Sequence, residues 1–143
     1  MKEIRHVGIV VKDMGKALYF YRDLLGLKVV NKMVEAGSYI DKILGLKDIR
    51  VATIKLAADD GNLVELLCFN SNKKEFNLKK AICRIGISHI AFTVKNLEEE
   101  CKRLTNKGVK FNAPPQCSPN GYAKVAFCKD PDGNFIELVE VLK

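Results

Sequence analysis

Four residues of this chain have side chains of the types that bind metal ions, and these residues stand at unusual positions in the sequence. His6 and His89 are its only histidines, and each adjoins a short apolar, β-branched run. Glu65 and Glu137 stand in the middle of two further apolar runs. The residues two positions before and after each of the four are apolar or glycine, and most of the adjacent residues are apolar as well. We therefore expect strands buried on both faces, where a carboxylate must be neutralised, paired or metal-bound. Two imidazoles and two carboxylates suit Zn, Ni, Co, Mn or Fe(II) and leave positions open for water or a two-oxygen substrate.

Each of these residues also has a plainer interpretation. A single histidine on an apolar strand is more often a hydrogen-bonded core residue than a ligand. A single buried glutamate could pair with Lys55, Lys124 or Arg50. The coincidence of all four in symmetric places favours the metal site over these alternatives.

The symmetry comes from an internal repeat. Residues 6–14 align with 89–97, matching a histidine, an apolar run, a lysine, a helix-capping Asp13 or Asn96 and an apolar first helical residue. Helical spacing of apolar residues then predicts a helix ending at Gly26 in the first copy and at Gly108 in the second.

Both halves end alike. An acidic glycine turn, at 59–62 and at 130–134, leads into a strand with the central glutamate. The histidines are 83 residues apart (89 minus 6) and the glutamates 72 (137 minus 65), so the first half carries 11 additional residues. We place these within residues 37–48 and expect a short extra helix or a lid there.

These elements predict an α+β fold of two tandem βαβββ modules, with curled mixed sheets around a metal-binding cleft. We expect one domain over residues 1–143, with module one at 1–69, a connection at 70–85 and module two at 86–143. The chain is long enough for one core built from two halves, whereas two independent domains would each be marginal.

The amino-acid composition of the chain limits the kinds of binding partner that we expect. Apolar residues make up 48% and charged residues 29% of the chain, as in a globular protein, and no apolar run is long enough to span a membrane. The net charge is +7, but the densest lysine cluster (73, 74, 79 and 80) has no interleaved aromatic residues, so we expect no nucleic acid partner. Five scattered cysteines without a CxxC pair predict free, idle thiols. A cytoplasmic location follows by default.

The chain resembles the vicinal oxygen chelate superfamily, which includes glyoxalase I, methylmalonyl-CoA epimerase, extradiol dioxygenases, fosfomycin-resistance enzymes and bleomycin-binding proteins. The resemblance covers the whole chain. It is most specific at the segment FYRDLLGL (20–27), at GISHIAF (86–92) and at DPDGNFIEL (130–138).

The resemblance implies that the four residues are the metal ligands of the family. A full His/Glu/His/Glu set is similar to bacterial glyoxalase I, whereas dioxygenases and fosfomycin-resistance enzymes lack the ligand at the position of Glu65 and bleomycin-binding proteins lack all four. The implied reaction is a lyase or isomerase reaction: proton transfer next to a carbonyl through a metal-stabilised enediolate, with Glu137 as first choice for the base and Glu65 as second.

One position departs from the glutathione-dependent members, which carry an arginine four residues after the first ligand. This chain has Val10 there, closer to the epimerases, although epimerases have glutamine in place of Glu65. The alternatives are therefore an epimerase-like racemase, a ring-cleaving dioxygenase and a metal-free binding or resistance protein. The expected substrate is a small molecule with vicinal oxygens, such as a thiol adduct or a thioester, and family members often form homodimers, some with swapped modules.

Overall fold

The computed structural model describes residues 2–70 and 81–143. They belong to two compact units, Met1–Leu78 and Lys79–Lys143, which are considered one at a time below. The lysine cluster at 73, 74, 79 and 80, and most of the expected connection at 70–85, lie outside the described residues.

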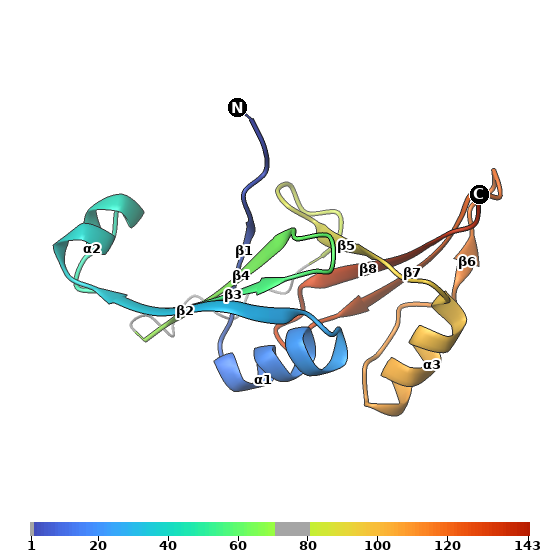
Figure 1. Ribbon diagram of the computed structural model, residues 1–143, viewed down its shortest axis with the longest axis horizontal. Helices are drawn as coiled ribbons and strands as arrows, with labels where there is room; N and C mark the ends of the chain where they lie inside the picture. The colour runs from blue at the N-terminus through green and yellow to red at the C-terminus, as the bar shows by residue number, and fades with distance from the viewer. Residues whose placement is uncertain (1, 71–80) are drawn as a thin grey trace. The chain divides into compact units, whose positions relative to one another are not determined.

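The first unit contains a mixed sheet with the strand order β1-β4-β3-β2 (Figure 1). β1 runs parallel to β4, and the other two pairings are antiparallel. The elements in chain order are β1 (Val7–Val10), α1 (Met14–Leu18), a π-helical segment η1 (Tyr19–Leu24), β2 (Lys28–Ala36), α2 (Ser38–Leu44), β3 (Arg50–Ala57) and β4 (Leu63–Phe69).

The second unit repeats this topology, with the strand order β5-β8-β7-β6 and the same parallel first pairing. Its last strand in the order, β6, is only two residues long and directly follows Pro114 and Pro115, which lack the backbone N–H groups that a ladder needs. The elements are β5 (His89–Thr93), α3 (Leu97–Asn106), β6 (Gln116–Cys117), β7 (Ala123–Lys129) and β8 (Phe135–Val141). The predicted α+β class and the βαβββ modules are confirmed, and neither sheet closes into a barrel.

The helix predicted after Asp13 begins as expected. The Asp13 side chain accepts a hydrogen bond from the backbone N–H of Lys16 at 3.0 Å, and Gly26 follows the helical segment with a φ of +80°. The second half, η1, is π-helical instead of α-helical, with the N–H of Leu25 bonded to the carbonyl of Phe20. An apolar spacing of three and four residues does not distinguish the two kinds of turn, so sequence alone could not predict it.

The additional residues of the first half form α2, so the predicted extra helix is confirmed. Ile40 is buried against Ile49 and Val51, and the Asp41 carboxylate accepts hydrogen bonds from the backbone N–H groups of Asp48 and Ile49. These contacts attach α2 to the start of β3.

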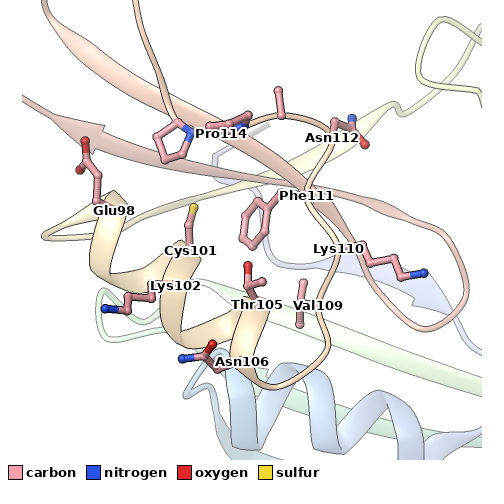
Figure 2. Close-up of a pocket in the computed structure, with 12 residues that line it drawn as sticks. Glu98, Cys101, Lys102, Thr105, Asn106, Val109, Lys110, Phe111, Asn112 and Pro114 are labelled. Carbon is pink, nitrogen blue, oxygen red and sulfur yellow. The ribbon is translucent and has the colours of Figure 1, made fainter.

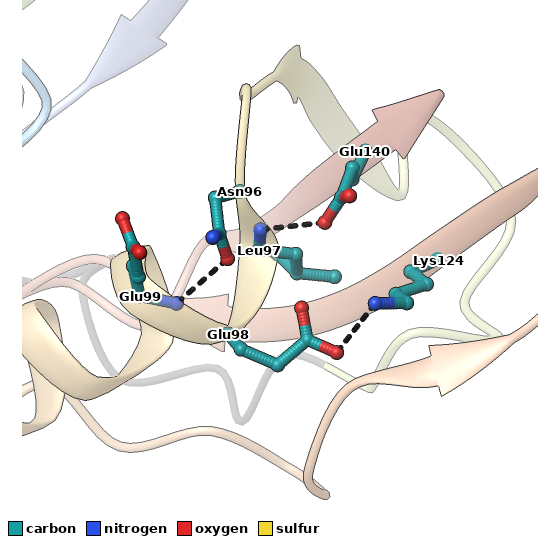
Figure 3. Close-up of polar contacts among 6 residues, drawn as sticks. All are labelled: Asn96, Leu97, Glu98, Glu99, Lys124 and Glu140. Atoms are coloured by element: carbon teal, nitrogen blue, oxygen red, sulfur yellow. Dashed lines mark hydrogen bonds and ion pairs between the residues drawn. The ribbon is translucent and has the colours of Figure 1, made fainter. Parts of the chain in front are cut away.

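Helix α3 has two caps at its N-terminus (Figure 3). The Asn96 side chain accepts a hydrogen bond from the N–H of Glu99, as predicted from the sequence. Glu140 on β8, 43 residues away in sequence, accepts a second one from the N–H of Leu97 at 2.8 Å. The second cap joins the helix to the strand that also carries Glu137.

The expectation that the ligand strands are buried on both faces is wrong. In β1 and β4, Ile9, Val64 and Leu66 are buried on the face that the helix covers, whereas Gly8 and Val10 on the other face are exposed. In β8, Ile136 and Leu138 are buried, whereas on the other face Glu137 and Val139 are partly buried and Val141 is exposed. That face is therefore open except at Phe135, which is buried. One face of each sheet is core and the other is open, because each module supplies a covering helix for one side only.

All five cysteines are free thiols. Among the described residues, no helix has both the length and the apolar character that a membrane span requires.

Candidate functional site

The first unit brings His6 and Glu65 together. Nε2 of His6 lies 3.2 Å from Oε2 of Glu65, and the side chains are 31% and 15% exposed. The sequence predicts His6 inside the first strand, but in the structure it stands one residue before β1. Gly8, two residues further, pairs in register with Glu65 on the parallel strand β4, and this pairing sets the two side chains on the same open face.

The second unit brings His89 and Glu137 together in the same way. Nε2 of His89 lies 3.1 Å from Oε2 of Glu137, with exposures of 34% and 19%. Ala91, two residues after His89, pairs in register with Glu137 on the parallel strand β8. The two pairs are therefore equivalent in topology, in register and in the atoms that face each other.

The donor atoms fit a divalent metal ion. With bond lengths of about 2.1 Å, two ligand atoms on one metal lie about 3.0 Å apart at a right angle and about 3.4 Å apart at a tetrahedral angle. The observed separations of 3.2 and 3.1 Å fall between these limits. Each pair thus presents one nitrogen and one oxygen at a spacing that a single ion can bridge. Within residues 2–70 and 81–143, no three His, Cys, Asp or Glu side chains form a group that could hold a metal.

The second ring nitrogen of each histidine, Nδ1, indicates which nitrogen is available to bind a metal ion. Nδ1 of His6 is buried and accepts or donates no hydrogen bond within the described part of the chain. Nδ1 of His89 lies 2.6 Å from Oγ of Ser88. With the ring proton on Nδ1, Ser88 accepts it and Nε2 keeps its lone pair for a ligand.

The residues opposite the two glutamates differ, so the two histidine–glutamate pairs have different surroundings. Lys55 on β3 lies opposite Glu65, and its Nζ is 3.4 Å from Oε1 of that carboxylate, so one of the plainer partners considered for Glu65 is present. Phe127 on β7 occupies the corresponding position opposite Glu137, and its ring meets that of His89 edge to face at 5.2 Å. Lys124, another partner considered, pairs with Glu98 instead.

Sequence reasoning missed Ser88 and Phe127. Ser88 directly precedes His89, so its adjacency was a usable signal. Phe127 was not, because its position depends on the antiparallel register of β7 and β8.

A pocket of about 700 Å³ lies in the second unit between α3 and residues 109–115 (Figure 2). Cys101, Thr105, Phe111 and Pro114 contribute to its lining. Neither His89 nor Glu137 lines it, so it is separate from their pair.

A family model of the Glyoxalase/Bleomycin resistance protein/Dioxygenase superfamily matches residues 3–138. The chain therefore belongs to this superfamily, as the fold and the paired modules indicate.

Two relatives whose names include lactoylglutathione lyase are similar to this chain over nearly its whole length. The chain is 31% identical over 143 residues to a lactoylglutathione lyase of Schizosaccharomyces pombe, covering 96% of this chain and 47% of that protein. It is 29% identical over 135 residues to a probable lactoylglutathione lyase of Synechocystis, covering 94% and 92%. The chain thus spans about half of the yeast relative and nearly all of the cyanobacterial one.

Solved structures agree on the fold. A glyoxalase family protein from Bacillus cereus matches with a TM-score of 0.90 at 22% identity, over 100% of this chain and 96% of that one. The fosfomycin resistance protein FosX from Listeria monocytogenes, in complex with Mn(II) and sulfate, matches with a TM-score of 0.64 at 15% identity, over 99% and 94%.

Proposed function

We propose that this protein is a divalent-metal-dependent lyase or isomerase of the glyoxalase type that moves a proton next to a substrate carbonyl. His6, Glu65, His89 and Glu137 are the metal ligands in this proposal. The observation that carries it is the pair of equivalent His Nε2–Glu Oε2 contacts, at 3.2 and 3.1 Å, one in each module. The two pairs complete one centre, from one chain or from two copies of it.

Several features support the proposal. The donor set suits a borderline transition metal such as Ni, Zn, Co, Mn or Fe. The open face of each sheet leaves the pairs accessible, unlike core ion pairs. The relatives named lactoylglutathione lyase agree with the reaction class.

The protein's own side chains hold the substrate and move the proton. A metal at these donors would draw electron density from two adjacent substrate oxygens and stabilise the negative charge that develops when the α-proton leaves. Glu137 accepts that proton from carbon and returns it to the same or the neighbouring carbon. His6 and His89 remain ligands, and Glu65 is the second candidate for the base.

The substrate class is a small molecule with vicinal oxygens. Val10 shares the open face with His6 and is 48% exposed, so an apolar side chain stands where glutathione-dependent members of the family carry arginine. This observation favours, as a second candidate, an epimerase-like reaction on a thioester. We also propose that the protein is cytoplasmic and forms a homodimer. Sedimentation of the purified protein would test the dimer.

Solvent deuterium uptake tests the reaction. The metal-loaded protein is offered hemithioacetals and 2-methyl acyl-CoA thioesters in deuterated water, and uptake at the α-carbon is expected with one of the two. Glu137→Gln should lower the rate by about 100-fold or more while metal remains bound.

Glu140→Gln is the matched control, because it makes the same change on the same strand at a residue that caps α3. It should retain the exchange rate. Full activity of Glu137→Gln would refute the assignment of the base.

A further inference from the structure

The two carboxylate oxygens of Glu65 have separate partners. Oε2 faces Nε2 of His6 at 3.2 Å, and Oε1 faces Nζ of Lys55 at 3.4 Å. Lys55 and Glu65 are register partners on β3 and β4, and their side chains are 26% and 15% exposed. An ion pair this sheltered is screened less by solvent than a surface pair.

Glu137 has no such partner within the described part of the chain. The register position that Lys55 holds opposite Glu65 is filled opposite Glu137 by Phe127, which donates no hydrogen bond. Among the described residues, His89 is the one side chain in an ion pair with Glu137. One carboxylate oxygen of Glu137 therefore has a partner among the described side chains, whereas both carboxylate oxygens of Glu65 have one.

We propose that Lys55 is a positioning residue that holds Glu65 as a one-oxygen ligand and so leaves proton transfer to Glu137. The inference rests on the proposed function and deepens it, since it says why two equivalent glutamates take different roles. To take a proton from substrate, Glu65 would have to swing away and break its contact with Lys55. Glu137 has no corresponding contact with a lysine or arginine of residues 2–70 and 81–143 to break.

The first test asks whether Glu65 becomes a base when Lys55 is removed. In the Glu137→Gln background, deuterium uptake is measured with Lys55→Met, with Lys55→Arg and with Lys28→Met added. Lys28 is the matched control, because it forms an exposed ion pair with Asp59 at the start of β2 in the same sheet. Lys55→Met should restore uptake about tenfold over Glu137→Gln alone. The Lys55→Arg and Lys28→Met combinations should remain at the level of Glu137→Gln.

The second test reads the ligand geometry without turnover. The visible absorption of the Co(II)-loaded protein depends on the number and arrangement of ligands. Lys55→Met should change this spectrum, because Oε1 of Glu65 becomes free to bind, whereas Lys55→Arg and Lys28→Met should preserve it.

A restored uptake together with a changed cobalt spectrum supports the role of Lys55. An unchanged spectrum, or Lys55→Met/Glu137→Gln as inactive as Glu137→Gln, overturns it. If the unsubstituted protein binds no cobalt and exchanges no proton, the proposed function itself has failed, and this result is distinct from either outcome for Lys55.

Discussion

His6 and His89 present the same nitrogen to their glutamates but differ at the other one. Oγ of Ser88 lies 2.6 Å from Nδ1 of His89, whereas Nδ1 of His6 is buried without a hydrogen bond from any described residue. A hydrogen bond at the second nitrogen fixes both the tautomer and the orientation of a metal-binding imidazole. Ser88 therefore supports one half of the proposed centre.

Ser88→Ala should weaken Zn(II) binding by about tenfold, because removal of a hydrogen bond to a ligating histidine typically costs that much affinity. Titration calorimetry measures the change. Ser38→Ala, at an exposed serine that begins α2, is the control and should bind as the unsubstituted protein does. Equal affinities for all three proteins would show that Ser88 does not orient the ring.

At the scale of elements, α3 depends on a residue of β8. The carboxylate of Glu140 accepts the N–H of Leu97, one of the donors that a helix leaves unpaired in its first turn. A negative charge there also interacts favourably with the helix dipole. The contact therefore connects the start of α3 to a strand that is distant in the sequence.

Glu140→Ala should lower the free energy of unfolding by about 1 kcal/mol, as the loss of a helix cap does. Urea unfolding followed by circular dichroism measures the difference. Glu140→Gln keeps an oxygen acceptor and should cost less than Glu140→Ala. Equal stability of the alanine variant and the unsubstituted protein would contradict the capping role.

The two caps show what could be predicted from the sequence. Asn96 was predictable because a cap and its helix are neighbours in the chain, and so were Asp13 and the glycine stops. Glu140 was not, because its partner is 43 residues away. The His and Glu pairs could be anticipated because the repeat displays the symmetry of the fold, whereas the open face that they occupy could not, since apolar neighbours suggested burial on both sides.

At the scale of the whole molecule, the five cysteines differ in how far they are exposed to solvent. Cys83 and Cys117 are exposed, Cys68 is partly buried, and Cys101 and Cys128 are buried. Burial raises the pKa of the Cys128 thiol to about 12, and burial followed by the charges of Glu100 and Glu98 raises the pKa of Cys101. The two buried thiols are thus protonated at neutral pH and poor nucleophiles.

Iodoacetamide at pH 8 should modify Cys83 and Cys117 first and reach Cys101 and Cys128 only after unfolding. Peptide mass spectrometry against time measures the order. Modification of Cys128 in the native protein as fast as that of Cys83 would contradict its burial.

The raised pKa of Cys128 also predicts a loss of stability in alkali. The native thiol stays protonated up to about pH 12, whereas the unfolded thiol ionises near its ordinary pKa of about 8.5. The contribution is therefore complete below about pH 8.5 and declines as the pH rises toward 12. Cys128→Ala should lose less stability than the unsubstituted protein between pH 8 and 10, as urea unfolding at each pH would show, and equal losses would contradict the assignment.

The central claim is that one histidine–glutamate pair from each module binds a single metal ion. The most direct measurement is the stoichiometry and affinity of Zn(II) for the unsubstituted protein, His6→Ala and His89→Ala. We predict one ion per chain and a loss of affinity of about 100-fold or more in either variant, because each removes one of four ligands. An unsubstituted protein that binds no ion, or a variant of either histidine that binds it as tightly as before, would contradict the claim.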